Sequence, residues 1–230
     1  MLGIIGAMDE EVAKVKEQMQ DVTVVKKASM DFYKGMLNGQ PVVVVRSGIG
    51  KVNAAVCTQI LVDDYQVDKV INTGIAGSLN ADIDIGDIVL STDTLEHDMD
   101  ATNFGYPLGQ IPRMDTLSFE ADSDLRMLAK KVCRQVNPDI EVFEGRVVSG
   151  DQFISDPVKK QWLVDNFAGY CTEMEGASIA HTAYLNKIPF LIIRAISDKA
   201  DDSASMDYPA FEAKAIEHSV KLILALCEQL

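Results

Sequence analysis

The sequence predicts a layered α/β fold in a single domain spanning residues 1–230, and three observations support this. The chain has 230 residues, of which 47% are hydrophobic and 24% charged, which suits one large domain with a buried core. Short apolar runs alternate with segments of helical periodicity, as in folds built on a largely parallel sheet. Several of these runs are continuously apolar, which is typical of strands buried on both faces.

Apolar runs that end at glycine or polar residues predict the strands, and helical periodicity predicts the helices. The predicted strands lie at 2–6, 22–28, 41–48, 67–74, 86–92, 140–150, 169–175 and 189–198. The predicted helices lie at 9–20, 50–65, 122–136, 156–166, 176–186 and 207–229. A further extended segment near 31–37 is joined to the next strand by Asn38-Gly39, a pair typical of hairpin turns, so we expect a mixed sheet.

Three consecutive acidic residues, Asp9, Glu10 and Glu11, stand where the first predicted helix begins. Acidic side chains at a helix N-terminus interact with unpaired N–H groups and stabilise the helix by roughly 0.3–1 kcal/mol. At a helical period Glu10 points away from the apolar face, while Asp9 and Glu11 lie at its two edges. A partly buried carboxylate at such an edge suits a general base, but periodicity does not choose between Asp9 and Glu11.

Two glycine turns, SGIGKV at 47–52 and NTGIAGS at 72–78, follow predicted strands. Glycine there allows the backbone to approach a ligand closely. Neither turn matches a nucleotide-phosphate loop, because the first lacks the upstream glycine and the second lacks the G-x-G-x-x-G pattern. A tight turn that packs a helix on a strand fits both sequences equally well.

The longest stretch without clear periodicity is 97–118, and loops of this length usually bind a ligand or a partner. It begins with His-Asp-Met-Asp at 97–100, which we interpret as a polar loop rather than a metal site, because several ligands would have to come from elsewhere. We expect neither a metal ion nor a cofactor.

The segment TEMEGASIAH at 172–181 places two carboxylates, Glu173 and Glu175, between a predicted strand and a predicted helix. In an extended segment the two side chains share one side, whereas in a helix they diverge. Capping of the helix N-terminus by one of them is the interpretation that the residues alone favour.

The predicted strand FLIIRAISD at 190–198 ends in Arg194, Ser197 and Asp198. An arginine inside so apolar a run needs a charged partner or a polar cavity. Ligands of open α/β sheets bind at the carboxyl ends of the strands, so Asp198 is a candidate catalytic acid. Its position alone slightly favours the alternative of a helix cap or turn residue.

The charge balance disfavours nucleic acid as a partner. The chain has 35 acidic and 21 basic residues, a formal net charge of −14, which repels phosphate backbones and favours a neutral or cationic small molecule. Four widely spaced cysteines match no metal or disulfide pattern and are interpreted as reduced core residues. The N-terminus has no targeting signal and no apolar run is long enough to span a membrane, so we expect a cytoplasmic protein.

Six motifs together resemble the 5′-methylthioadenosine/S-adenosylhomocysteine nucleosidases, in the order and nearly at the spacing of that family. They are GIIGAMDEEV, SGIGKVNAA, NTGIAG, VVSGDQFI, EMEGA and RAISDKAD. The resemblance covers essentially the full chain. It implies a three-layer α/β/α fold with a central mixed sheet, shared with purine nucleoside phosphorylases, a nucleoside substrate and a homodimer.

The resemblance also implies roles for particular residues. Cleavage of an N-glycosidic bond needs an acid for the leaving group and a base for water on the opposite face of the sugar. Asp198 would donate a proton to adenine N7, and Glu11 would activate the water. Glu175 would accept hydrogen bonds from the ribose hydroxyls, Arg194 would help hold the water and ribose side, and Ser197 would orient Asp198.

Further positions match substrate-binding residues of the family. Phe153 would stack on adenine and the backbone of Ile154 would contact its edge, since stacking on a base contributes about 1–3 kcal/mol. The other matched positions on the same subunit are Met8, Ile49, Ala76, Gly77, Met174 and Tyr208. The positions expected to complete the partner subunit's site are Ala101, Phe104 and Pro112.

Ile75 departs from the family, because many relatives have serine or threonine there, and we expect an altered KM rather than lost activity. Two alternatives of the same fold remain, an aminodeoxyfutalosine nucleosidase and a phosphate-dependent purine nucleoside phosphorylase. A nucleoside sensor without catalysis is a third, but a sensor has no need of an acid and a base on opposite faces of its ligand.

Overall fold

The chain forms ten strands and six α-helices in the computed structural model, which describes residues 1–201 and 203–230, with the side chains of 205–209 left out. The strands are β1 Leu2–Gly6, β2 Gln20–Lys27, β3 Met30–Leu37, β4 Gln40–Arg46, β5 Lys69–Ser78, β6 Ile88–Glu96, β7 Phe119–Glu120, β8 Val142–Ser149, β9 Cys171–Glu173 and β10 Phe190–Asp198. The helices are α1 Asp9–Glu17, α2 Lys51–Tyr65, α3 Ser123–Val136, α4 Pro157–Phe167, α5 Gly176–Asn186 and α6 Ala204–Cys227, with a 3-10 turn η1 at Thr102–Phe104.

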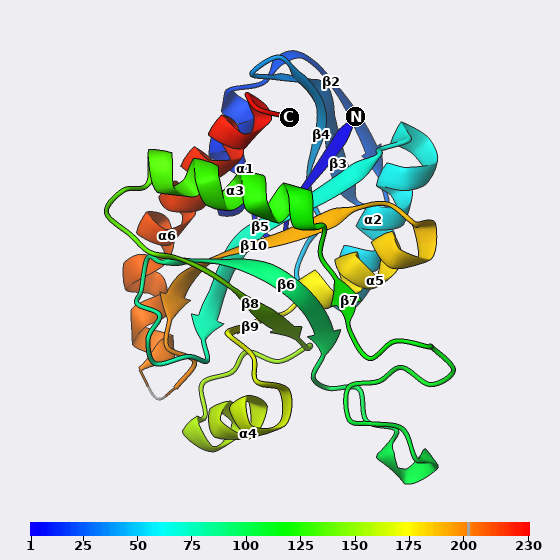
Figure 1. Cartoon of the computed structure of the whole chain (residues 1–230). Coiled ribbons are helices and arrows are strands. Elements are labelled where there is room, and N and C mark those ends of the chain that lie inside the picture. Colours follow the sequence, from blue (N-terminus) through cyan, green and yellow to red (C-terminus); the bar gives the residue numbers. More distant parts are fainter. Residues whose placement is uncertain (202) are drawn as a thin grey trace.

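The sheet is mixed and closes on itself at one end (Figure 1). The strands β10, β6, β8, β9 and β5 follow one another, and β10 also pairs with β5, so these strands form a ring. Beyond the ring, β1, β4, β3 and β2 continue from β5 as an open wing. The mixed sheet is confirmed: β1 is parallel to both β4 and β5, whereas β2, β3 and β4 pair antiparallel through the predicted Asn38-Gly39 hairpin.

Helices cover both faces of this sheet, which confirms the three-layer α/β/α fold (Figure 1). One layer contains α1, α3 and α6, with α6 packed against both of the others. The other contains α2 packed on α5, and α4 covers one end of the ring. The predicted elements are all present, β1 and α5 with the predicted ends and the others with shifted ends. The short elements β7 and η1 were not predicted, because elements of two or three residues have no periodicity.

Burial explains why the strands read as continuous apolar runs. All residues of β1 and β10 are buried, and Val42–Val45 of β4 are fully buried, because helices lie above and below these strands. The edge strand β2 is exposed along its whole length and ends in Lys26 and Lys27. Charged side chains on an edge strand disfavour pairing with another sheet.

A local gap in the sheet positions the candidate site. One edge of β5 pairs with β1 as far as Asn72, and the same edge pairs with β9 only from Gly77 onward. Between these two positions β1 and β9 diverge, while β10 stays paired to the opposite edge of β5. The backbone of 73–76 therefore faces a space that side chains or a ligand must fill.

We predict that Gly145→Ala destabilises the fold, because a Cβ at this position of β8 would overlap the ring of Tyr170, just before β9. The expected loss is about 1–3 kcal/mol in the free energy of unfolding, measured by urea denaturation. Gly39→Ala is the control: it has open space at φ +85°, so we expect at most about 1 kcal/mol there from backbone strain. A Gly145→Ala protein as stable as the parent would contradict this packing.

Candidate active site

A cavity of about 510 Å³ opens at the gap between β1 and β9, at the carboxyl ends of β1, β5 and β10. This is where ligands bind in sheets of this kind. The lining residues come from six parts of the chain that are far apart in sequence. They are Ala7, Met8, Glu11, Ile49, Ile75, Ala76, Gly77, Phe153, Thr172, Glu173, Met174, Glu175, Ser197 and Asp198.

Glu11 faces the cavity and Asp9 does not, which answers the question that periodicity left open. The Glu11 side chain is 3% exposed. Its carboxylate accepts hydrogen bonds from the N–H groups of Ala7 at 2.6 Å and Met8 at 3.0 Å, at the start of α1. The other oxygen accepts from the N–H of Ile75 at 3.1 Å, in the gap of the sheet. Asp9 lies at the surface, beside Lys16 and Arg46.

Two opposed effects act on the ionisation of Glu11. Burial is the larger and raises the pKa of the carboxyl group, whereas the Arg194 charge and the three backbone donors lower it. The net pKa lies above the ordinary value, which suits a base working near neutral pH. Gly74 allows this arrangement, because a Cβ there would overlap both Arg194 and Glu11.

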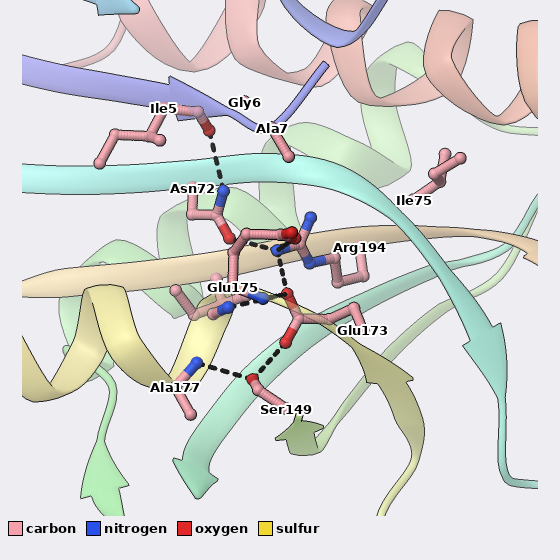
Figure 2. A network of polar contacts seen from close by, with 12 residues as sticks. Ile5, Gly6, Ala7, Asn72, Ile75, Ser149, Glu173, Glu175, Ala177 and Arg194 are labelled. Carbon is pink, nitrogen blue, oxygen red and sulfur yellow. Dashed lines mark hydrogen bonds and ion pairs between the residues drawn. The ribbon is translucent and has the colours of Figure 1, made fainter. Parts of the chain in front are cut away.

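Arg194 is the centre of a buried polar network (Figure 2). Its guanidinium donates to Asn72 Oδ1 and Glu173 Oε2, and lies 3.8 Å from Glu175 Oε2. Asn72 in turn donates to the Ile5 carbonyl at 2.9 Å, which fixes its orientation. The charged partners that an arginine inside an apolar strand requires are therefore Glu173 and Glu175. Arg194 lies beneath these two side chains and is 1% exposed.

Glu173 and Glu175 have different partners although both line the cavity. Glu173 accepts hydrogen bonds from the N–H groups of Glu175 at 3.0 Å and Gly176 at 2.8 Å, and from the Ser149 hydroxyl. It is therefore the residue that caps α5, as one of the two was expected to do. Glu175 accepts from the N–H of Gly50 at 2.8 Å, just before α2 begins.

The pKa of Glu175 is displaced far above its ordinary value. Burial raises its pKa, the negative charge of Glu173 adds to this, and the result is about 7. Arg194 and the Gly50 N–H act in the opposite direction, while Glu11 raises the pKa further. Its carboxyl group therefore changes charge near neutral pH when the cavity is empty.

Asp198 faces the cavity from the end of β10 and is 2% exposed. Its Oδ2 accepts from the Ser197 hydroxyl at 2.8 Å and its Oδ1 from the Ala200 N–H at 2.8 Å, so it is a turn residue as well. Gly77 makes room for it, since a Cβ there would lie 2.7 Å from Asp198 Oδ1. Glu11 and Asp198 thus reach one cavity from α1 and β10.

The other predicted site residues fall into three groups. Met8, Ala76, Gly77 and Met174 line the cavity, and Ile49 and Phe153 stand at its mouth, about half exposed. Ile154 lines a small adjoining cavity of about 40 Å³, together with Phe153 and Asp198. The side chain of Tyr208 lies outside the described residues.

The predicted partner-site residues lie on the long loop, away from this cavity. This loop projects from the body of the molecule (Figure 1). Ala101 is buried at its base, whereas Phe104 is 84% exposed and Pro112 is also exposed. None of the three lines the cavity of its own chain as described.

Three contributors to the site were not predicted. The backbone N–H groups of Ala7 and Gly50 hold carboxylates, and backbone donors have no side-chain signature, although Gly50 belongs to a glycine turn that the sequence singled out. Thr172 lines both the main and the adjoining cavity. Its place directly before the Glu-Met-Glu segment was the only signal for it.

Charge restricts the chemistry of the cavity. Glu11, Glu173, Glu175 and Asp198 line it, and its described wall contains no lysine or arginine. Among the residues that the structure describes, no group of three or more His, Cys, Asp or Glu side chains is placed to hold a metal ion. Within the same residues, no helix has the length and apolar character needed to cross a membrane.

Comparison with known proteins gives consistent results. The phosphorylase superfamily model matches residues 1–228. The chain is 42% identical to a 5′-methylthioadenosine/S-adenosylhomocysteine nucleosidase of Staphylococcus carnosus, with both chains covered completely. It resembles the crystal structure of the Neisseria meningitidis nucleosidase with methylthio-immucillin-A, at a TM-score of 0.96, 37% identity and coverage of 100% and 99%. It also resembles the structure of a futalosine hydrolase of Helicobacter pylori, at a TM-score of 0.94 and 34% identity, with 100% of this chain and 97% of that chain covered.

The ionisation of Glu175 predicts a specific dependence of stability on pH. The folded chain keeps this proton up to about pH 7, whereas the unfolded chain releases it near 4.5. The folded state therefore binds more protons between these values, and the stabilisation, fully present at low pH, is lost as the pH rises through about 7. Glu175→Gln removes this loss, so urea denaturation should show the variant gaining up to ~3 kcal/mol on the parent across this window. Parallel stability curves would contradict the assignment.

Proposed function

The chain belongs to the phosphorylase superfamily, and we propose that it hydrolyses the N-glycosidic bond of 5′-methylthioadenosine and S-adenosylhomocysteine, releasing adenine and a 5-thio-substituted ribose. One observation carries this proposal: Glu11 and Asp198, both buried, reach the same cavity from different elements, each held in a fixed orientation. Hydrolysis of a glycosidic bond needs such a pair of carboxyl groups.

The proposed mechanism assigns the acid to Asp198 and the base to Glu11. Asp198 gives a proton to adenine N7, so that the base takes the electron pair of the breaking C1′–N9 bond and departs as neutral adenine. The sugar becomes oxocarbenium-like, and Glu11 takes a proton from the water whose oxygen bonds to C1′. Ser197 orients Asp198 by donating to its carboxylate. The raised pKa of Glu11 strengthens it as a base near neutral pH.

Glu175 is proposed to bind the sugar. As a carboxylate it accepts hydrogen bonds from the 2′- and 3′-hydroxyls, and its negative charge stabilises the developing cation. Arg194 lies beneath the cavity and contacts Glu173 and Glu175. Through these acids it is proposed to help position the water and the ribose. Ile75 supplies an apolar wall and a backbone N–H for Glu11, but no hydroxyl for the sugar or the water.

The adenine and the thio-substituent are proposed to occupy opposite ends of the cavity. Phe153 stacks on adenine and Ile154 contacts its edge beside Asp198. Met8, Ile49 and Met174, with Tyr208, surround the ribose and the alkylthio group. Methionine is unbranched and polarizable, which suits a pocket that accepts more than one alkylthio substituent.

Two alternatives differ in the nucleophile or in the substrate. A phosphorylase needs cationic groups where phosphate binds, whereas the described wall of this cavity holds acidic residues without lysine or arginine. Likeness to the Helicobacter pylori futalosine hydrolase makes aminodeoxyfutalosine the second candidate substrate, cleaved by the same mechanism. Comparing the release of adenine from methylthioadenosine, adenosylhomocysteine and aminodeoxyfutalosine identifies the preferred substrate. Dependence of that release on phosphate identifies a phosphorylase.

We further propose a cytoplasmic homodimer that acts in methionine salvage. In this dimer Ala101, Phe104 and Pro112 of one subunit complete the site of the other. The 84% exposure of the apolar Phe104 side chain on a projecting loop supports this, since large apolar groups on such loops usually contact a partner.

We predict that Asp198→Asn and Glu11→Gln each reduce the release of adenine from methylthioadenosine at least about a hundredfold, because each removes a proton transfer. Circular dichroism should show an unchanged fold. Glu10→Gln, at the exposed neighbour of Glu11, is the matched control and should keep full activity. The parent chain should release adenine equally with and without phosphate. Dependence on phosphate would indicate the phosphorylase, and full activity of either site variant would contradict its assigned role.

We predict that Phe104→Ala lowers kcat/KM about tenfold through KM, because the partner's pocket loses an apolar wall worth about 1–2 kcal/mol. Sedimentation should show a dimer for both the parent and the variant. Asn103→Ala, at the exposed neighbour of Phe104 on the same loop, should leave kcat/KM unchanged. A monomeric parent with full activity would contradict the shared site.

A further inference from the structure

Three carboxylates, Glu11, Glu173 and Glu175, line the cavity above the buried Arg194 guanidinium, and the mechanism uses only two of these three. Glu11 and Glu175 have assigned roles, whereas Glu173, which lies beside Glu175 and Arg194 in Figure 2, has none. Burying a third acid beside two others is unfavourable unless hydrogen bonds and a cation compensate it. The contacts of Glu173 show what it contributes.

Glu173 is fully engaged by donors from the protein. Two backbone N–H groups at the start of α5, the Ser149 hydroxyl and the Arg194 guanidinium all donate to it. With both oxygens so engaged, the Glu173 side chain is poorly placed to accept from a sugar hydroxyl. Glu173 is therefore fixed by the protein and is not a substrate ligand.

The hydrogen bond from Arg194 to Glu173 fixes the orientation of the guanidinium. The guanidinium donates to Glu173 and Asn72, but it lies 3.8 Å from Glu175 Oε2, beyond hydrogen-bond distance. Glu175 is held instead through its other oxygen by the Gly50 N–H. The oxygen of Glu175 that lies nearer to Arg194 is therefore ion-paired with it at 3.8 Å but accepts no hydrogen bond from it.

We propose that Glu173 is a positioning residue that keeps Arg194 beyond hydrogen-bond distance of Glu175, so that the Glu175 carboxylate remains available to the sugar hydroxyls and to the developing cation. This inference rests on the proposed function, because it assumes that Glu175 binds the sugar. It gives the first acid of the Glu-Met-Glu segment a role distinct from that of the second.

The charges around Glu175 support this arrangement. They are Glu11 from α1, Glu173 from β9 and Arg194 from β10, with the Gly50 N–H before α2. The pKa of Glu175 is raised to about 7 by burial and then by Glu173, against the effect of Arg194. Without the charge of Glu173, the repulsion disappears and Arg194 is free to move within hydrogen-bond distance of Glu175. Both changes lower the pKa of Glu175, and the second makes Arg194 compete with the sugar.

The test measures ligand binding against pH in the full-length Asp198→Asn protein, which should bind methylthioadenosine without cleaving it. Calorimetry gives the Kd between about pH 5 and pH 9, and binding should strengthen as Glu175 ionises near pH 7. In the Asp198→Asn/Glu173→Gln protein this rise should move down by at least about one pH unit. Above pH 8 the Kd should be about fivefold to tenfold weaker, because Arg194 occupies Glu175.

Two controls separate this effect from a general loss of structure or charge. Glu144→Gln makes the same substitution on β8, where Glu144 pairs with Arg126 and Lys130, and should leave the pH dependence unchanged. Glu173→Asp keeps the negative charge and should restore most of the pH dependence of the Asp198→Asn protein. A role of Glu173 confined to capping α5 would lower stability without moving the pH dependence.

A pH dependence of binding that is the same with and without Glu173→Gln overturns the inference and leaves the proposed function intact. Failure of methylthioadenosine to bind the Asp198→Asn protein overturns the proposed function itself. If Glu173→Gln does not fold, carbon-13 NMR of labelled glutamate in the parent chain replaces it, with Glu175→Gln assigning the signal. Titration of Glu175 near its ordinary pKa of 4.5 would then show that Arg194 already neutralises it, and would overturn the inference.

Discussion

The site depends on one electrostatic constraint: acidic side chains buried together must be stabilised by donors that the fold itself supplies. Arg194 offsets part of their charge, and the starts of three helices supply the rest. Glu11 accepts N–H groups at the start of α1, Glu173 those at the start of α5, and Glu175 the Gly50 N–H before α2. The positive ends of three helices thus converge on one cavity, where a low local dielectric strengthens their effect.

The sheet makes this convergence possible. Because β1 and β9 diverge along β5, the backbone between Asn72 and Gly77 needs partners on that edge, and Glu11 supplies one at Ile75. The same carboxylate therefore completes the sheet, caps its own helix and faces the ligand. Closure of the strands into a ring brings β10 to the other edge of β5 and places Asp198 beside Gly77.

Much of the fold was predictable from the sequence, because buried strands, amphipathic helices and the Asn38-Gly39 turn have local signatures. Ring closure was not, since β10 pairs with β5 across more than a hundred residues. In the site, the strand end singled out Asp198 and Arg194, but position alone slightly favoured a turn role for Asp198, and only the family resemblance favoured the acid. The resemblance also preferred Glu11 to Asp9 and Glu175 to Glu173. The physical basis of these choices lies in the Ile75 N–H, Ser149, Gly50 and Arg194, which are distant in sequence and have no local signature.

We propose that a nucleoside binds with its base toward Asp198 and its sugar between Glu11 and Glu175. A crystal structure of this chain with methylthio-immucillin-A tests that claim most directly. We expect the base of the inhibitor within hydrogen-bond distance of Asp198, its sugar ring against Glu175, and Glu11 on the face of the ring opposite the base. An inhibitor bound outside this cavity, or one with Glu11 and Asp198 on the same face of its ring, would contradict the account.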